Sequence, residues 1–572
     1  MSALQPEQTS NQRPGHAKIR SLLLTKSPSK AQSTTTTTTT PIRSAVSTPD
    51  YHHHIDHETH ANRVDIQTQP RKYHILTNAG KPVWSTEHED ENRPDGDLTS
   101  QMGLIQAVIS IFEVDNNDQL RYIDAGQTKI AVMSRPPLYF LAVSNWGEPE
   151  STLRMHLEYL NLLIQSILST TQLQKMFQYR PNYDLRGGLA GTESIFKWLV
   201  DRLQWDLSIM MASLSVYRCP AEIRDRISKL ITPTTSPSPN APDTQLDSLA
   251  TKLLYSIVIT NAKVVSVVRP KNHSVHPSDL QIIMATILSS KSIKSSESWI
   301  PICLPGYNAT GFLHAYVKFE PRVDVGLVLI SKDRAGFYEA QRWSETILKD
   351  PVWDEFRRLR KKPSQSDLLS TPPSTSISSA SSSKAETQGT RPECQERLET
   401  RMEQSSPTPP LNPRSWGEYS LEDLGIPGLR HFIYKDKKYV QVSYPTWEDD
   451  YLIESNRQRL IVNYQRAFDI IHPKKPKLIK KINVDPNSGN KHFSVDQEDN
   501  SASSCCLPPP IKFALFKTPH ESVIGWITDS HEIFVTVSPL ISKSASILIV
   551  HSIVNWVKLH HQTLFLTSSN QF

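Results

Sequence analysis

The sequence has 572 residues and a formal net charge of +5, because 63 Lys and Arg residues face 58 Asp and Glu residues. That charge is small for the length and argues against a dedicated nucleic-acid-binding protein, which usually carries a stronger basic bias. The 37% hydrophobic and 21% charged residues, together with 41 prolines, indicate several folded domains separated by segments that cannot build a core.

The cysteines and the apolar runs bear on the cellular compartment. The adjacent pair Cys505 and Cys506 has poor geometry for a zinc site or a structural disulfide, and no C-x-x-C pair occurs. This usage is typical of the reducing cytosol or nucleus. The first residues have no apolar signal core, and no stretch reaches the roughly 18 apolar residues of a membrane span. We therefore expect membrane association to be peripheral. The other cysteines are Cys219, Cys303 and Cys394.

The predicted elements begin after a tail. Residues 1–70 hold a threonine run and almost no periodic apolar pattern, which predicts disorder. Two strands follow at 72–77 and 83–85, and the turn at 78–82 takes its chemistry from Gly80.

A buried helix is predicted next, over 103–112, with Ser100 as its N-cap. Its apolar side chains recur at i, i+3 and i+4, the spacing of one helix face. Three strands and an amphipathic helix then follow at 120–124, 129–134, 138–144 and 150–168. Further helices are predicted at 192–203 and 221–231.

The same order of elements appears twice more. The second block has its elements at 252–258, 263–268, 277–289, 299–303, 311–319, 323–331 and 335–348. The third has them at 429–435, 439–443, 450–471, 512–516, 522–528, 532–537 and 543–558. The order β-β-α-β-β-β-α therefore repeats with a period of roughly 160 to 180 residues, without obvious sequence identity between copies.

This pattern predicts an α+β protein with three tandem domains, each a five-stranded antiparallel sheet flanked by helices. Segments rich in Pro, Ser and Thr mark the boundaries between the domains. The expected organisation is a tail at 1–70, a first domain at 71–231, a linker at 232–250, a second domain at 251–362, a disordered linker at 363–413 and a third domain at 414–572.

Long and specific motifs occur in all three blocks. In the first they are the segments 138–144 (LYFLAVS), 157–160 (LEYL), 181–186 (PNYDLR) and 191–193 (GTE). In the second they are 298–305 (SWIPICLP), 311–316 (GFLHAY) and 327–331 (LVLIS). In the third they are 431–435 (HFIYK), 538–540 (SPL) and Trp556. On these motifs the chain resembles the vacuolar fusion protein Mon-one family, over about 73–360 and 414–566.

The resemblance implies three longin domains and a role in guanine nucleotide exchange. With a second tri-longin subunit of the Ccz-one type, the family forms the exchange factor for a late-endosomal and vacuolar GTPase of the Rab-seven type. This implies functions in endosome maturation, vacuole fusion and autophagosome fusion. It also implies an upstream early-endosomal Rab as partner, and a cytosolic protein that associates peripherally with endosome, multivesicular body and vacuole membranes.

Exchange needs no bond-making group, so no catalytic residue and no cofactor are expected. The resemblance implies a platform on the first longin domains of both subunits that opens the switch regions of the GTPase. We assign this chain's share to the hairpin at 78–84 and the following helix. The residues are Asn78, Lys81, Trp84, Gln101, Met102 and Gln106. Ordinary packing of Trp84 and Met102 is the open alternative. The heterodimer seam is expected on apolar surface of the same domain.

Two basic clusters are candidates for contact with an anionic, phosphoinositide-bearing membrane, where each cation contributes about 1 kcal/mol. A solvated charged face is the open alternative for both. Trp299 opens a strand and is a candidate contact for the upstream Rab, with burial in the second core as the alternative. The basic residues are Arg357, Arg358, Arg360, Lys361 and Lys362, then Lys474, Lys475, Lys477, Lys480 and Lys481.

Motifs of hydrolases, P-loop nucleotidases and zinc proteases are absent from the sequence. A histidine patch in the tail has spacings that a helix would place on one face, but its polar surroundings favour a solvated tail over a zinc site. The patch is His52, His53, His54, His57 and His60. Two other functions stay open: a non-enzymatic longin scaffold or tether in endolysosomal trafficking, and an adaptor subunit of vesicle coats.

Overall fold

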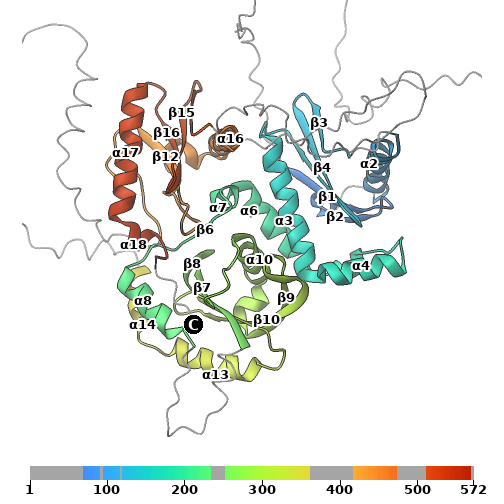
Figure 1. Ribbon diagram of the computed structural model, residues 1–572, viewed down its shortest axis with the longest axis horizontal. Coiled ribbons are helices and arrows are strands. Elements are labelled where there is room, and N and C mark those ends of the chain that lie inside the picture. Colours follow the sequence, from blue (N-terminus) through green and yellow to red (C-terminus); the bar gives the residue numbers. More distant parts are fainter. Residues whose placement is uncertain are drawn as a thin grey trace, which may run out of the picture. The chain divides into compact units, whose positions relative to one another are not determined.

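The computed structural model describes residues 69–89, 95–115, 119–233, 252–360, 416–472 and 511–567, which belong to one compact unit (Figure 1). The predicted tail, most of both predicted linkers and the histidine patch lie outside the described residues.

The first domain is a five-stranded antiparallel sheet with the strand order β2-β1-β5-β4-β3. Alternate side chains of its strands point to opposite faces. Tyr73, Ile75 and Phe140 pack against α3, and Leu76 and Leu141 pack against α2. The elements are β1 (Lys72–Thr77), β2 (Pro82–Ser85), α2 (Asp95–Asp115), β3 (Tyr122–Ala125), β4 (Thr128–Arg135), β5 (Leu138–Ser144) and α3 (Glu150–Leu168).

Helix α2 differs from the prediction in length and in burial. It begins at Asp95, so Ser100 lies inside the helix and its assignment as N-cap is wrong. Among the side chains of α2 that the structure describes, only Ile109 is fully buried, whereas Ile111 is 48% exposed and Phe112 is 36% exposed. The apolar periodicity is real, but the sheet covers only one stripe of the helix. Leu104, Ile105 and Val108 are half-buried.

The rest of the first domain is helical and adds to the α3 side of its core. The elements are α4 (Thr170–Tyr179), α5 (Arg186–Leu189) and α6 (Glu193–Trp205). Phe196 and Leu199 of α6 are fully buried there, but Leu173 is the only buried residue of α4.

The segment after Trp205, which we assigned to the first domain, packs with the other two domains. Leu207 and Met210 of α7 join a core cluster of the third domain, and Ile223 and Ile227 of α8 join one of the second. The elements are α7 (Leu207–Met210), β6 (Leu214–Ser215) and α8 (Ala221–Leu230).

The second domain repeats the first with the strand order β8-β7-β11-β10-β9. Helix α10 covers one face, where Leu280 and Ile283 are buried, and α8, α13 and α14 cover the other. The elements are β7 (Leu253–Thr260), β8 (Lys263–Val268), α10 (Pro277–Leu288), α11 (Lys291–Ser295), β9 (Ser298–Leu304), α12 (Pro305–Asn308), β10 (Ala309–Glu320), β11 (Val325–Ser331), α13 (Phe337–Leu348) and α14 (Val352–Arg360).

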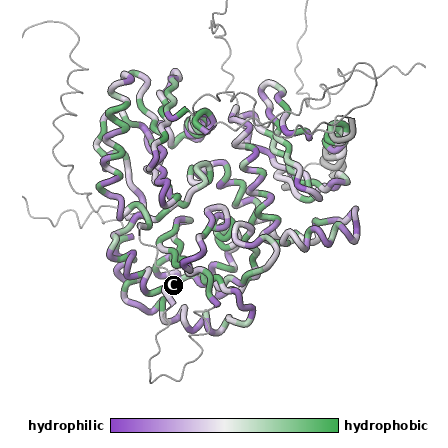
Figure 2. Tube along the Cα trace, viewed as in Figure 1, coloured by the Kyte–Doolittle hydropathy of each residue, from purple (hydrophilic) through white to green (hydrophobic). Residues whose placement is uncertain are grey.

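The third domain has the strand order β14-β15-β16-β12-β13-β6, with α16 on one face and α17 on the other. The elements are β12 (Leu429–Asp436), β13 (Gln441–Ser443), α16 (Glu454–Ile471), β14 (Phe513–Lys517), β15 (Ser522–Ile527), β16 (His531–Val537), α17 (Lys543–Leu559) and α18 (His561–Leu564). The helix predicted from residue 450 begins at Glu454, after a short 3-10 turn. Figure 2 shows green and purple alternating along the helices, as amphipathic packing requires.

The sixth strand of the third sheet comes from the segment between α7 and α8. Leu214 and Ser215 pair in parallel with β13, and the next residue, Val216, forms a parallel bridge to Val264 of β8. Tyr217 N donates to Val264 O at 2.8 Å. This connecting strand, residues 214–217, therefore joins the sheets of the second and third domains. The three-fold repeat and the α+β class are confirmed, with this strand as an addition to the five expected in the third sheet.

Candidate functional site: the hairpin and helix of the first domain

The predicted hairpin lies at one edge of the first sheet, because β2 is an outermost strand. Thr77 N donates to Lys81 O at 2.9 Å, and Gly80 N donates to Thr77 O at 2.8 Å. Gly80 has φ +76°, a conformation that favours glycine. The turn thus ends β1 sharply and leaves Asn78 and Lys81 exposed.

The structure brings this turn against helix α2. A Cβ added at Gly80 would lie 3.3 Å from both Cβ and Cγ of Gln106. The turn with Asn78 and Lys81 and the side chain of Gln106 therefore belong to one surface region. Gln101 and Met102 are part of α2, but their side chains lie outside the described residues.

Lys81 reaches a segment that the sequence reading did not include. Its Nζ donates to Asn182 O at 2.7 Å, in the loop after α4. The hydrogen bond from Arg186 and the charge of Lys81 hold the pKa of Asp184 in that loop below its usual value. Tyr179, at the end of α4, is 87% exposed. This exposed aromatic side chain extends the candidate surface. In the sequence, the only signal of its exposure is its position at a helix end bounded by a proline.

Trp84 has a packing role in addition to any role in binding. Its ring stacks on Phe196 of α6, with 4.8 Å between centroids and 24° between planes. The residue remains half-buried, so part of its surface stays accessible. Both hypotheses for Trp84 therefore remain compatible with its position.

Helix α2 supplies an apolar surface that is uncovered in this chain. Ile111 and Phe112 are neighbours on its last turns and are both exposed. Adjacent exposed apolar side chains are typical of a surface that another protein covers. The expected heterodimer seam on the first domain has its clearest candidate here.

Trp299 lies on β9, an outermost strand of the second sheet. Its Nε1 donates to Arg334 O at 3.2 Å. Its ring stacks on His314 with centroids 5.6 Å apart and meets Phe337 edge-on at 6.1 Å. It is half-buried, which leaves a partial surface at a sheet edge for a partner.

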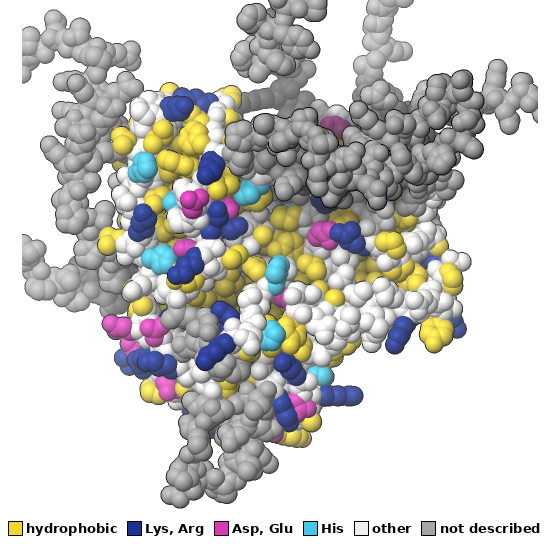
Figure 3. All heavy atoms as spheres, viewed as in Figure 1, with side chains coloured by type: hydrophobic (Ala, Val, Ile, Leu, Met, Phe, Trp, Pro, Cys, Tyr) yellow, Lys and Arg dark blue, Asp and Glu magenta, His cyan; other side chains and the backbone are white. Residues whose placement is uncertain are grey.

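The first basic cluster divides into two kinds of residue. Arg357 and Arg358 are exposed at the end of α14. Arg360 is held by the protein, because its Nη2 lies 3.0 Å from Asp324 Oδ2 and 3.3 Å from Asn261 Oδ1. Figure 3 shows acidic and basic side chains side by side over α8 and α14. The remaining residues of both clusters lie outside the described part: Lys361, Lys362, Lys474, Lys475, Lys477, Lys480 and Lys481.

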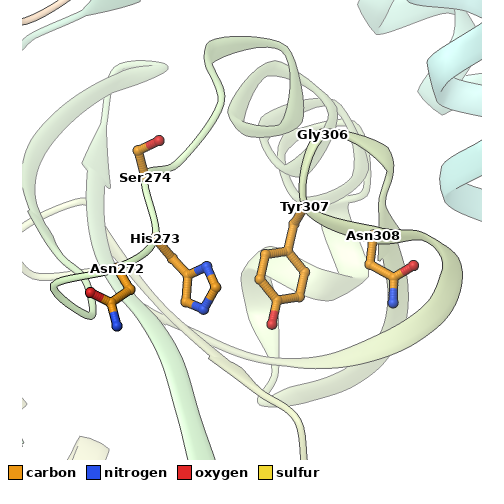
Figure 4. Close-up of a pocket in the computed structure, with 6 residues that line it drawn as sticks. All are labelled: Asn272, His273, Ser274, Gly306, Tyr307 and Asn308. Atoms are coloured by element: carbon orange, nitrogen blue, oxygen red, sulfur yellow. The ribbon is translucent and has the colours of Figure 1, made fainter.

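A hollow of about 440 Å³ lies in the second domain, between the loop that precedes α10 and the short helix α12 (Figure 4). His273 and Tyr307 line it with ring centroids 5.3 Å apart. Asp279 accepts a hydrogen bond from Gly306 N at 2.9 Å beneath it, and burial raises the pKa of this carboxyl. Ser274 also lines the hollow, and Figure 4 shows its side chain directed away from the His273 ring.

In the described ranges, Cys219 and Cys303 are buried free thiols, and burial raises the pKa of Cys303 to about 11. Among those residues, His, Cys, Asp and Glu form no group of three or more that could hold a metal ion. No helix in the described part is long and apolar enough to span a bilayer.

Comparison with known families identifies the repeated domain. Residues 71–199, 251–349 and 428–561 match, in this order, the first, second and third longin domains of FUZ, MON1 and HPS1. The matches fall on the three sheets and their helices, so the expected longin fold is confirmed.

Three relatives that match most of the chain are vacuolar fusion proteins of the MON1 type. The chain is 34% identical to the vacuolar fusion protein MON1 of Cryptococcus neoformans over 88% of its own length and 66% of the relative's. It is 27% identical to MON1 of Mycosarcoma maydis, over 88% and 69%. It is 29% identical to the MON1 homolog A of Gallus gallus, over 87% and 72%. The chain thus spans about two thirds of the length of these relatives.

Proposed function

Because the chain belongs to the family of the vacuolar fusion protein MON1, with its three longin domains, we propose that it is one subunit of a heterodimeric guanine nucleotide exchange factor. Its partner is a second tri-longin subunit of the Ccz-one type. Its substrate is a late-endosomal or vacuolar GTPase of the Rab-seven type.

One observation carries the proposal furthest. The hairpin turn and α2 touch at Gly80 and Gln106, and the last turns of the same helix expose Ile111 and Phe112. The first domain therefore has an exposed polar turn packed against a helix that also exposes two apolar side chains. Such a pair of surfaces suits one subunit contact and one GTPase contact on the same helix.

Exchange by this surface works through differential binding. An exchange factor binds the nucleotide-free GTPase more tightly than the nucleotide-bound form, so it shifts the population towards release. The exposed ammonium of Lys81 and the amide of Asn78 are suited to polar groups of a switch region. No bond is made or broken in this step, so it needs no nucleophile, acid or base.

The cellular setting follows from the same proposal. The subunit associates peripherally with endosome, multivesicular body and vacuole membranes and supports endosome maturation and the fusion of vacuoles and autophagosomes. Trp299, half-exposed at the β9 edge, is the proposed contact for the upstream early-endosomal Rab. Arg357 and Arg358, with the lysines beyond the described residues, are the proposed contacts for an anionic membrane.

The test is nucleotide release. A Rab-seven-type GTPase is loaded with fluorescent GDP, and the chain is added alone and with its tri-longin partner. We expect acceleration only with both subunits, because each supplies part of the platform. A stable heterodimer that leaves release unchanged would favour the scaffold or tether function instead.

Variants sharpen this test. Lys81→Glu reverses a charge on the exposed turn and is expected to lower the catalysed rate about tenfold or more. Lys349→Glu, an exposed residue of the second domain, is the matched control and should keep the wild-type rate. Both variants should still bind the partner subunit. Equal rates for Lys81→Glu and the control would remove the hairpin from the platform.

A further inference from the structure

The loop after β5 lies against helix α16 of the third domain. Arg466 of α16 donates to Gly147 O from Nε at 3.3 Å and from Nη2 at 3.0 Å. Ser151 Oγ donates to Asp469 Oδ1 of the same helix at 2.5 Å. Gly147 has φ +81°, and a Cβ there would lie 3.1 Å from Arg466 Nη2. We call this contact, between residues 146–151 and α16, the α16 seam.

A buried ion pair stands directly behind the seam. Arg71 Nε lies 2.6 Å from Glu148 Oε1, and both side chains are 0% exposed. The guanidinium carbon of Arg71 lies 3.8 Å above the ring of Trp146. Arg71 Nη2 also lies 3.5 Å from Gln465 Oε1 of α16. One arginine thus contacts the seam loop of the first domain and the helix of the third.

Arg71 is the residue immediately before β1. This strand pairs on one side with β2 and on the other with β5, in register from Lys72 opposite Val143 to Thr77 opposite Leu138. Six residues of strand span about 20 Å. The pairing with β5 is unbroken, whereas the pairing with β2 shifts register between Ile75 and Leu76. The continuous pairing with β5 resists bending, so a displacement at one end of β1 is passed to the other. The far end of β1 is the hairpin turn at Asn78.

We propose that the α16 seam positions the exchange surface of the first domain. The third domain holds β1 at Arg71, and β1 holds the hairpin turn in the orientation that engages the GTPase. Arg466 and Asp469 are then positioning residues, although they lie in another domain than the hairpin. This inference rests on the proposed exchange function.

The seam can be weakened without opening a core. Arg466 is exposed and bonds to a backbone carbonyl, so its truncation leaves no cavity and no unpaired buried charge. Arg71 and Glu148 are unsuitable for the same purpose, because loss of either would leave a buried charge unpaired. The test therefore uses the double variant Arg466→Ala, Asp469→Ala in the full heterodimer.

Two measurements are made on that variant. The first is nucleotide release at increasing GTPase concentration. We expect the maximal rate to fall about threefold to tenfold with the half-saturating concentration almost unchanged. The second is hydrogen–deuterium exchange of the backbone, where we expect faster uptake in 72–81 as well as in 146–151. Lys349→Ala, which removes an exposed lysine of the second domain paired with Glu345, is the control for both.

The possible outcomes distinguish a failure of the positioning role from a failure of the exchange function. Uptake that rises in 146–151 alone, with an unchanged maximal rate, would overturn the positioning role. Arg466→Lys restores a donor at the seam and should recover part of the maximal rate. If the wild-type heterodimer does not accelerate nucleotide release from the GTPase, the proposed exchange function is wrong. Uptake in 72–81 still tests the mechanical link in that case, and unchanged uptake there overturns it.

Discussion

Arg224 of α8 donates through Nη1 to Phe565 O at 3.0 Å, and so ties the connection between the first two domains to the end of the third. The same guanidinium donates to Gln562 O at 2.6 Å, and to Tyr217 O and Thr563 O at 2.9 Å each. Arg224 is 3% exposed, and its guanidinium donates to four backbone carbonyl groups. The guanidinium of Arg224 thus supplies hydrogen bonds to carbonyl groups that are buried in this turn of the chain.

We therefore expect Arg224→Met to lower the free energy of unfolding by about 3 kcal/mol or more, since buried carbonyl groups lose charge-assisted hydrogen bonds. Arg226→Met is the matched control on the same helix. Its ion pair with Glu355 is about half exposed, so its loss should cost less than about 1 kcal/mol. Chemical denaturation of both variants measures the difference. Equal destabilisation would mean that the carbonyl contacts contribute little.

The buried ion pair gives a second prediction. Arg71→Met leaves the carboxylate of Glu148 buried without its cation and should destabilise the protein by about 3 to 5 kcal/mol. The double variant Arg71→Met, Glu148→Leu removes both charges and should recover much of that loss. Thermal and urea unfolding of the three proteins form the test. A double variant less stable than the single one would contradict the electrostatic explanation.

The hairpin turn can be examined with two glycines of similar conformation. Gly80 and Gly126 have φ +76° and +79°, but only a Cβ at Gly80 meets neighbouring atoms within 4 Å. Alanine at either position should cost about 1 to 2 kcal/mol from backbone strain. Gly80→Ala should cost more, because its Cβ presses on Gln106. Equal costs in denaturant titrations would show that Gln106 gives way freely.

Buried histidines predict how stability depends on pH. Burial lowers the pKa of His431 to about 3 and that of His74 to about 4, from an ordinary 6.5. Between its lowered pKa and 6.5, each of these histidines is protonated in the unfolded chain and neutral in the folded chain. The free energy of unfolding therefore falls as the pH drops below about 6.5, by about 2 kcal/mol per histidine at pH 5.

Urea unfolding at pH 7.5 and pH 5 measures this loss. His431→Gln removes one titrating group and should reduce the difference between the two pH values by about 2 kcal/mol. The remaining difference belongs to His74 and to other buried histidines such as His156, whose pKa burial also lowers. The comparison uses the difference, because the substitution also changes the contacts of residue 431 with Trp447 and Tyr464. An unchanged difference in the variant would assign the loss to other groups.

Much of the fold could be predicted because local patterns and packing agree. The bounds of α3, Glu150–Leu168, match the prediction residue by residue, since its apolar positions recur with helical spacing up to a clear break. The strands were predicted within one to three residues at most ends. Side chains alternate between the two faces along each strand, and turn residues separate the strands. Both are local signals that can be read from the sequence.

The elements that depend on distant partners could not be predicted. Leu214 and Ser215 form too short a run to indicate a strand, and they become one only because β13 lies beside them. The exposure of Phe112 likewise depends on which stripe of α2 the sheet covers. Periodicity reports that a helix has an apolar side, and it does not report how much of that side is covered.

The candidate site was predicted in part. Asn78, Lys81 and Gln106 lie in one region, but that expectation came from the resemblance to a family and not from the residue pattern. The contacts of Lys81 with Asn182, and of Gly147 with Arg466, join residues 101 and 319 positions apart. No local signal reports such pairs in a single sequence.

The connecting strand links the second and third domains through their sheets as well as through the chain. Leu214 and Ser215 pair with the edge of β13, and Val216 and Tyr217 meet Val264 of β8. Proteolysis between Arg360 and Trp416 would sever the covalent link from the second domain to the third and still leave their sheets held together. A third domain produced alone would instead bare a strand edge open to aggregation. The third domain therefore depends on residues outside it to cover the edge of its own sheet.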